Sequence, residues 1–174
     1  KVAIKCSVEN LADTADITLP GTLFNRALKV EQKIAEGDAV RIRLGYDRIL
    51  RDEFSGYVSE IATDNDSVRI HCEDELYKFR KDLKDRVLKS VTVKTLLTSV
   101  AEEVGKYEVA CDYDFTYDNF TIHAATGYDV LRKVQSETKA NIYLRGKTLH
   151  VHPQYAQIGE KVIYDFAVNI EKSD

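Results

Sequence analysis

The chain has 174 residues, of which 44% are hydrophobic and 31% charged, and its formal net charge is −4. This composition is typical of an ordinary soluble protein and excludes a mainly disordered chain. The acidic balance disfavours binding to nucleic acid, which needs a basic stripe to neutralise phosphates. The length allows one large domain or two small ones.

The sequence contains no run of the roughly 20 apolar residues that a membrane helix needs. Its first residues alternate like a strand, whereas a secretion signal has a continuous apolar core. We therefore expect no membrane partner. The three cysteines Cys6, Cys72 and Cys111 lie far apart, and we interpret them as reduced thiols. The chain has no Met, even at position 1, and we expect it to be a piece of a longer protein.

The first 82 residues are predicted to form a small β-barrel. Apolar and polar side chains alternate in five segments, as in strands with one buried face: Lys1–Val8, Thr14–Leu19, Asp38–Tyr46, Phe54–Ile61 and Ser67–Glu73. Thr22–Ile34 fits either a short helix or an ordered loop. Asp74–Lys81 is expected to be a short helix that plugs one end of the barrel.

The last two of these strands are predicted to form a hairpin with a polar turn over residues 64–66. If the loop is Asp64-Asn65, three pairs lie opposite each other: Ile61 with Val68, Tyr57 with Cys72, and Glu60 with Arg69. A slip of the loop by one residue still keeps the odd-numbered apolar side chains against Val68, Ile70 and Cys72. The face is therefore better determined than the register.

A second domain of α+β type is predicted over residues 83–174, after a boundary in the charged stretch Lys81–Lys89. Its first helix is Val93–Val104, whose apolar residues recur at helical spacing and which Gly105 is expected to end. Tyr107–Asp112 and Phe120–Ala124 are expected to be strands. The predicted fold class of the whole chain is α+β, mainly antiparallel β.

The end of the sequence predicts a helix followed by a hairpin. Thr126 and Asp129 resemble a capping box that opens a helix through Thr138. In Asn141–His152, Gly146 fits the first central position of a type II′ turn, which pairs Leu144 with Leu149 and Ile142 with Val151 and puts Tyr143 and His150 on the other face. Lys161–Phe166 is predicted to be a last strand.

No residue pattern supports catalysis, a cofactor or a metal ion. His150 and His152 have a spacing that can bind zinc, but no third ligand is readable, and we interpret them as part of an exposed strand face. His71 with Glu73 is a similar case, and Cys72 is expected on the opposite face from His71. The acidic loop Asp112, Asp114 and Asp118 lacks the Gly and final Glu of an EF-hand. Glu102 and Glu103 are expected to be solvated.

Several motifs resemble a known family. Four segments are similar to the first barrel of phage tail baseplate hub proteins, the late control gene D family related to VgrG spike hubs. They are Asp16-Ile-Thr-Leu-Pro-Gly21, Gly37-Asp-Ala-Val-Arg-Ile-Arg-Leu-Gly-Tyr46, Phe54-Ser-Gly-Tyr-Val-Ser-Glu-Ile61 and Cys72-Glu-Asp-Glu-Leu-Tyr77. Thr126-Gly-Tyr-Asp-Val-Leu131 and Asn141-Ile-Tyr-Leu-Arg-Gly-Lys-Thr-Leu149 resemble the helix and hairpin that follow that barrel. The resemblance covers nearly the whole chain.

The resemblance implies a structural hub subunit in a virion tail, made in the bacterial cytoplasm. Such a hub trimerises, and two barrels per subunit form a ring that joins the tail tube to the spike. Only one barrel fits before Arg80, so the second is expected beyond Asp174. The family brings no catalytic residues to this region.

The residues themselves suggest one interface. The polar face that carries Arg41, Arg43, Glu60 and Arg69 is a candidate subunit surface, with simple solvation as the alternative. Two other functions compete with the hub: a β-barrel module that binds a glycan or peptide, and, in third place, a cell-wall hydrolase.

Overall fold

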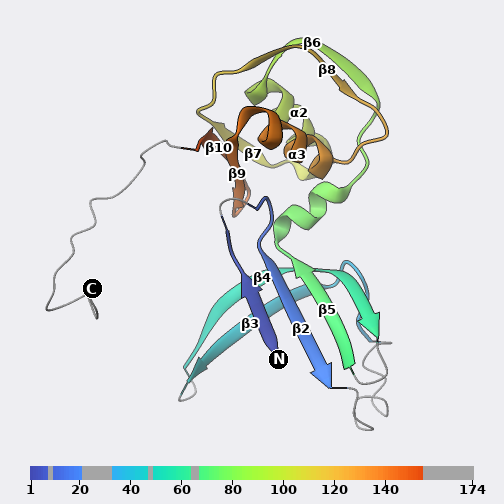
Figure 1. Cartoon of the computed structure of the whole chain (residues 1–174), viewed down its shortest axis with the longest axis vertical. Helices are drawn as coiled ribbons and strands as arrows, with labels where there is room; N and C mark the ends of the chain where they lie inside the picture. Colours follow the sequence, from blue (N-terminus) through green and yellow to red (C-terminus); the bar gives the residue numbers. More distant parts are fainter. Residues whose placement is uncertain (8–9, 21–32, 47–48, 64–66, 155–174) are drawn as a thin grey trace, which may run out of the picture.

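The computed structural model describes residues 1–7, 10–20, 33–46, 49–63 and 67–154. These residues form two units that follow each other in sequence and lie one above the other (Figure 1). The lower unit is a curled five-stranded sheet, and the upper unit combines helices with two smaller sheets. The predicted fold class, α+β with mainly antiparallel β, is confirmed, and the N-terminal part, predicted as a small β-barrel with a capping helix, is a curled half-barrel sheet.

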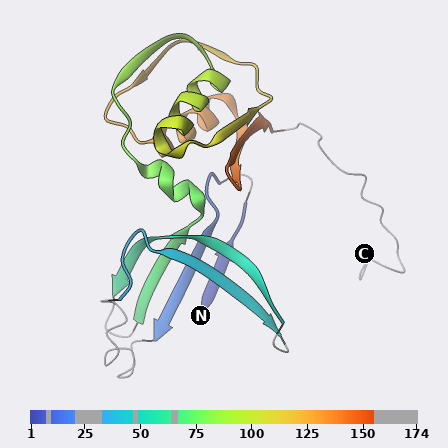
Figure 2. The same cartoon turned by 180° about the vertical axis from the view of Figure 1, so that it is seen from behind.

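The lower sheet is antiparallel throughout and has the strand order β1-β2-β5-β4-β3. Its strands are β1 (Val2–Lys5), β2 (Thr14–Pro20), β3 (Ala39–Tyr46), β4 (Ile49–Thr63) and β5 (Ser67–Glu73). All five predicted strands are present, although β4 begins well before Phe54. Among the described strands, β1 and β3 pair with one neighbour each and not with each other. The sheet is therefore a half-barrel with one open side, where a closed barrel was predicted (Figure 2).

Strand β4 curls because it carries two β-bulges. Glu53 is the extra residue opposite β3, and Ser59 is the extra residue opposite β5. Each bulge shifts by one position the alternation between inward and outward side chains. Between the bulges the even-numbered Phe54 and Val58 are therefore buried, although the odd-numbered residues were predicted to face inward.

The predicted register of the β4–β5 hairpin is wrong. A longer connection than the predicted two-residue loop moves the pairing by two positions in the part of the hairpin that contains Ile61, and beyond the bulge at Ser59 the displacement is one position. As a result Ile61 lies opposite Ile70, Glu60 opposite His71, and Tyr57 opposite Glu73. The predicted turn itself, over residues 64–66, lies outside the described residues.

The two units have separate hydrophobic cores. The lower core fills the concave side of the half-barrel and contains Ala15, Ile42, Phe54, Val58, Val68, Ile70 and Cys72. The upper core is larger and is built around the helices. Leu11 and Ala12, from the connection between β1 and β2, are buried in the upper core. The division between the cores is consistent with the predicted domain boundary near residue 82. The boundary stays a prediction, because Leu11 and Ala12 precede it in sequence but belong to the upper core.

A short 3₁₀ helix, η2 (Glu75–Arg80), joins the units. Its N-cap is Asp74, whose side chain accepts a hydrogen bond from the Leu76 N–H at 2.9 Å. The prediction that this segment plugs the barrel is wrong, because Leu76 and Phe79 are fully buried in the upper core. The exposed side of η2 turns back to the half-barrel, where Tyr77 stacks on Tyr57 with 5.8 Å between ring centroids.

The upper unit packs two α-helices against two small sheets. Its elements are β6 (Arg86–Thr92), α2 (Val93–Gly105), β7 (Glu108–Cys111), β8 (Thr116–Ile122), α3 (Gly127–Thr138), β9 (Ala140–Arg145) and β10 (Thr148–Pro153). One sheet has the order β7-β10-β9, with β7 parallel to β10, and the other pairs β6 with β8. Neither α-helix is long and apolar enough to span a membrane, as far as the described residues go.

The caps explain where the helices start and stop. Thr126 and Asp129 form the predicted capping box at the start of α3. Helix α2 ends one residue later than predicted, because Lys106 adopts the left-handed conformation (φ 60°) expected of Gly105. Gly105 itself is the last helical residue, and the ring of Tyr107 lies where a side chain would be.

The β9–β10 hairpin has the predicted register. Leu144 lies opposite Leu149, Ile142 opposite Val151 and Tyr143 opposite His150. Gly146 has a φ of 62°, as the first central residue of a type II′ turn requires. The predicted last strand, Lys161–Phe166, and most of Thr22–Ile34 lie outside the described residues.

Candidate assembly surfaces

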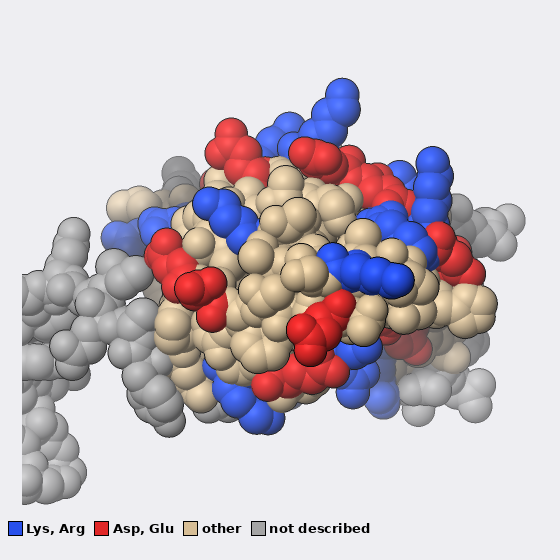
Figure 3. Space-filling model, turned by 90° about the horizontal axis from the view of Figure 1, so that it is seen from above, with Lys and Arg blue, Asp and Glu red and all other residues tan. Residues whose placement is uncertain are grey.

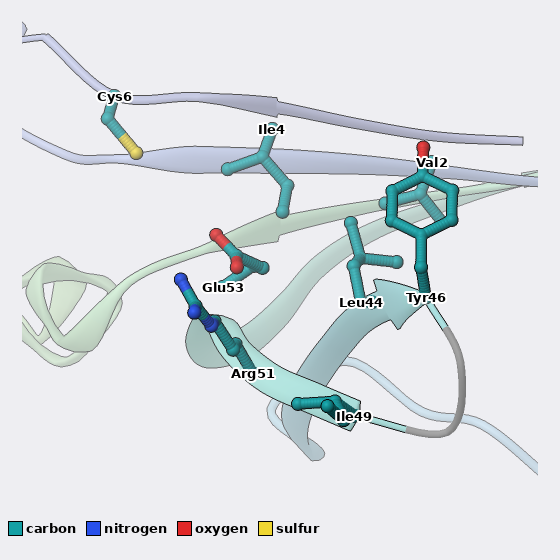
Figure 4. A pocket seen from close by; sticks show the side chains of 9 residues that line it. Val2, Ile4, Cys6, Leu44, Tyr46, Ile49, Arg51 and Glu53 are labelled. Atoms are coloured by element: carbon teal, nitrogen blue, oxygen red, sulfur yellow. The ribbon is translucent and has the colours of Figure 1, made fainter. Parts of the chain in front are cut away.

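The open side of the half-barrel is an apolar hollow between its two edge strands. Three side chains point across the opening towards the far end of the β3–β4 hairpin (Figure 4). They are Val2 and Ile4 of β1 and Cys6, which directly follows β1. Leu44 and Ile49 line the opposite wall. The hollow has a volume of about 730 Å³.

Large apolar side chains are exposed around this hollow. Among the described residues, most such side chains belong to β1 and the β3–β4 hairpin: Val2, Leu44, Tyr46, Ile49 and Leu50. Tyr46 is 91% exposed and Ile49 is 69% exposed, which is unusual at the tip of a hairpin. Clustered apolar exposure of this kind marks an interaction site.

The backbone at the opening also lacks partners within the described strands. The outer edges of β1 and β3 carry N–H and C=O groups that no described strand pairs. Exposed edges of this kind are templates for an added strand. Free edges and an apolar lining thus occur together at one opening, as on a surface that accepts an added strand.

Charged groups stand on one wall of the hollow. Arg51 and Glu53 of β4 line it together with the apolar residues (Figure 4). At the upper end, burial and the neighbouring Asp13 carboxylate raise the pKa of the Cys6 thiol. This thiol is exposed and, with a raised pKa, is a weak nucleophile.

The four residues predicted as a subunit interface lie on the opposite, convex face of the same sheet. Arg41, Arg43, Glu60 and Arg69 are all exposed, and their strand neighbours Ile42 and Ile70 point into the core. The structure brings them onto one face but not into one cluster, because they are spread over β3, β4 and β5. Their role as an interface stays a prediction.

The convex face carries an ion pair and a His–Asp hydrogen bond in the described part. The Nε atom of Arg41 lies 4.0 Å from Oδ1 of Asp52, and both side chains are mainly exposed. The Nδ1 atom of His71 lies 2.6 Å from Oδ1 of Asp16 on the neighbouring strand β2. An exposed ion pair such as Arg41–Asp52 contributes little to stability, so its charges remain available to a partner.

The candidate metal ligands do not assemble into a site. Within the described residues, no group of three or more His, Cys, Asp or Glu side chains is close enough to hold an ion. The ring of His150 stacks on Tyr143, at 5.1 Å and 12° between planes, and His152 contacts the same tyrosine edge-on. Cys72 is buried in the lower core whereas His71 faces outward, as predicted.

A second, smaller hollow of about 290 Å³ lies between the units, and no pattern in the sequence predicts it. It is lined by Cys6 and Ser7 at the end of β1, by Asp13 and Asp74, and by Tyr143 and Leu144 of β9, among others. Burial raises the pKa of Asp74 to about 6, and the nearby carboxylates of Asp13 and Glu73 act in the same direction. Two hydrogen bonds, from the Leu76 and Asp13 N–H groups, partly oppose this shift.

The upper surface of the molecule offers no charged stripe. Seen from above, basic and acidic side chains are interspersed around a neutral centre (Figure 3). This face therefore has no footprint for a phosphate backbone.

No family model matches this chain, and no curated protein matches its sequence. Among the solved structures that share its fold are two tail proteins. The 43 kDa tail protein of prophage MuSo2 from Shewanella oneidensis has a TM-score of 0.57 and 16% identity over 86% of this chain. The tail protein from Neisseria meningitidis MC58 has a TM-score of 0.51 and 13% identity over 86% of this chain. The chain spans about half the length of these proteins, 48% and 45% respectively.

Proposed function

We propose that this chain is a structural part of a phage tail or a related contractile injection apparatus, in a baseplate hub that connects the tail tube to the spike. The observation that carries the proposal is the fold, which two tail proteins share over 86% of the chain. The match includes both units, so it does not rest on one common motif. The motifs quoted above for the hub family support the finer assignment.

The surfaces described above suit a part that acts by assembly. Within the described residues there is no cluster of metal ligands, whereas there is an apolar opening with free strand edges and a convex face with exposed charges. We propose that the full-length protein is a homotrimer in the virion tail, and that it contacts tail tube and spike proteins. In this arrangement Arg41, Arg43, Glu60 and Arg69 lie at a subunit interface.

The test is the mass in solution of the full-length protein that contains this chain. Light scattering is expected to give a trimer, and Arg41→Glu with Arg43→Glu is expected to shift the mass towards the monomer. Lys94→Glu is the matched control, because this exposed lysine lies on α2, away from the half-barrel. A monomer in the unaltered protein contradicts the proposal.

A binding module is the second candidate, because the hollow of about 730 Å³ is large enough for a small ligand and Tyr46 beside it offers an exposed ring. A monomeric protein that binds a glycan or peptide saturably, and loses this binding on Tyr46→Ala, would favour the module over the hub.

A further inference from the structure

We propose that the junction between the half-barrel and the upper unit is a pH-dependent joint, which is closed when the Asp74 carboxyl group is protonated and loosens when it is ionised. The proposal concerns the motion of one unit relative to the other in a single chain, so it goes beyond the tail function and does not depend on it. It rests on how the chain crosses the junction, on the hydrogen bonds there, and on the charges that surround Asp74.

The two units meet at a narrow junction (Figure 2). Their hydrophobic cores are separate, and the described chain crosses between them at two places. One is the β1–β2 connection, which carries Leu11 and Ala12 into the upper core, and the other is η2, which follows β5. Because neither core extends across the junction, the contacts at these crossings hold the units in their relative position.

Asp74 and Asp13 tie the two crossings together. The Asp74 N–H donates to the carbonyl oxygen of Asp13 at 3.0 Å, and the Asp13 N–H donates to Oδ2 of Asp74 at 3.1 Å. The other carboxylate oxygen of Asp74, Oδ1, accepts the Leu76 N–H of η2 at 2.9 Å. Oδ1 of Asp13 accepts the Ser7 N–H at 3.2 Å. The Asp74 carboxyl group thus bonds both crossings, so a change in its charge acts on the whole junction.

The surroundings of Asp74 disfavour its ionised form. In the described chain, the titratable groups that face it from neighbouring elements are anionic or neutral at pH 7: the Cys6 thiol, the Asp13 and Glu73 carboxylates, and the hydroxyls of Tyr128 and, across the hollow, Tyr143. The two cations of η2, Lys78 and Arg80, are each engaged by a glutamate. Burial, the largest influence, raises the pKa of Asp74 to about 6, although two N–H hydrogen bonds favour the carboxylate.

The hollow between the units provides a way to relieve this unfavourable burial of charge. It has a volume of about 290 Å³ and is lined by Asp13 and Asp74 and, from β9, by Tyr143 and Leu144. Widening of the hollow lets water reach the Asp74 carboxylate. It breaks hydrogen bonds of the junction, whereas both cores stay packed. Ionisation therefore favours local opening of the joint over unfolding of either unit.

Linkage between proton binding and opening gives the direction and size of the effect. The closed joint binds the Asp74 proton more tightly than an open joint, in which the carboxyl group regains its ordinary pKa of 3.8. The opening equilibrium constant is therefore lowest below about pH 4, rises with pH and levels off above about pH 6. The difference between 3.8 and about 6 limits the whole increase to roughly a hundredfold.

Hydrogen exchange tests the joint at single amides of the complete 174-residue chain. NMR spectroscopy measures the protection factors of the Asp13 and Asp74 N–H groups at about pH 4 and about pH 7, and these factors already allow for the intrinsic pH dependence of exchange. The amides of Ile70 in the lower core and Leu97 in the upper core report whether each unit stays folded.

We expect the protection of the Asp13 and Asp74 amides to fall roughly tenfold or more from about pH 4 to about pH 7, with little change at Ile70 and Leu97. Equal protection of the junction amides at both pH values overturns the proposal. A parallel fall at Ile70 and Leu97 also overturns it, because whole units then unfold.

Two substitutions assign the effect to one carboxyl group. In Asp74→Asn, whose amide does not ionise, the fall in protection is expected to disappear. Asp118→Asn is the matched control, because this exposed carboxylate lies on β8, away from the junction, and the fall is expected to remain. A fall in Asp74→Asn as large as in the unaltered chain overturns the proposal.

A second measurement needs no substitution. The chemical shift of the carboxyl carbon of Asp74 reports the ionisation of this group in the unaltered chain. Protection of the junction amides is expected to stop falling at the pH where this shift completes its titration. A fall that continues well beyond that pH contradicts the joint even if Asp74→Asn fails to fold. Neither measurement bears on the trimer of the full-length protein, so the two proposals can fail separately.

Discussion

The guanidinium of Arg80 holds the carboxylate of Glu73 with two hydrogen bonds, from Nε to Oε2 at 2.8 Å and from Nη2 to Oε1 at 2.6 Å. Glu73 ends β5 and is only 6% exposed, whereas Arg80 ends η2 and is half-exposed. The same guanidinium lies over the ring of Tyr128 in α3, 4.6 Å from its centroid. One side chain thus links the half-barrel, the connecting helix and the upper unit.

Arg80→Ala is expected to destabilise the protein, because it leaves the buried Glu73 carboxylate without its cation. We expect the free energy of unfolding to fall by about 2 kcal/mol, less than for a fully buried pair. Urea denaturation measures this change. Lys78→Ala is the matched control: Lys78 also bonds a glutamate, but the side chain of this Glu75 is 31% exposed whereas that of Glu73 is 8% exposed, and a loss within about 0.5 kcal/mol is expected.

Gly56→Ala is expected to be strongly destabilising. A Cβ atom on Gly56 would lie 2.0 Å from the carbonyl oxygen of Glu73, so β4 and β5 would have to separate. A loss of about 3 kcal/mol or more in unfolding free energy is expected from such a backbone clash. Gly146→Ala is the comparison, since its Cβ meets nothing within 4 Å and only the positive φ opposes it, at a cost of about 1 kcal/mol. Equal losses at the two sites would contradict the close approach.

Thr126→Ala is expected to weaken the start of α3. The hydroxyl of Thr126 accepts a hydrogen bond from the Asp129 N–H at 3.1 Å, and the Asp129 carboxylate accepts one from the Thr126 N–H at 2.9 Å. Loss of an N-cap of this kind costs about 1 kcal/mol, which thermal unfolding detects as a lower Tm. Ser136→Ala, an exposed position in the last turn of the same helix, is expected to change Tm little.

Asp74 is expected to make stability depend on pH. Burial raises its pKa in the folded protein to about 6, above the ordinary value of 3.8. The folded state therefore binds the proton more tightly, so this contribution to stability is complete below about pH 4 and is lost as pH rises through 6. We expect the unfolding free energy to fall by about 2 kcal/mol across this interval.

Asp74→Asn isolates this effect, because the amide keeps an oxygen that can cap η2 at the Leu76 N–H. Urea titrations at several pH values are expected to give a flatter profile for Asp74→Asn between about pH 4 and 6. An unchanged slope would show that a group other than Asp74 carries the pH dependence.

Local signals predicted the elements whose register a short turn fixes. The β9–β10 hairpin was predicted residue by residue, because a two-residue turn at Gly146 leaves only one pairing. The capping box at Thr126 was predicted for a similar reason, since its partner is three residues away. Both devices are contained in a few consecutive residues.

Long-range features could not be predicted in this way. The bulges at Glu53 and Ser59 have no signature in the alternation of β4, yet they decide which of its side chains are buried. Strand β6 was missed because its residues lie in a charged stretch that was interpreted as a boundary. The apolar opening was missed as well, although Tyr46, Ile49 and Leu50 around a turn were a signal of it.

The two bulges also restrict how β4 can change in evolution. Deletion of one residue between the bulges, from Phe54 to Val58, would turn core side chains outward over the rest of β4. Deletion of a bulge residue, Glu53 or Ser59, would instead straighten the strand. Homologues are therefore expected to differ in length mainly in the loops. A homologue that lacks one residue at either bulge should have a flatter sheet and a wider opening between β1 and β3.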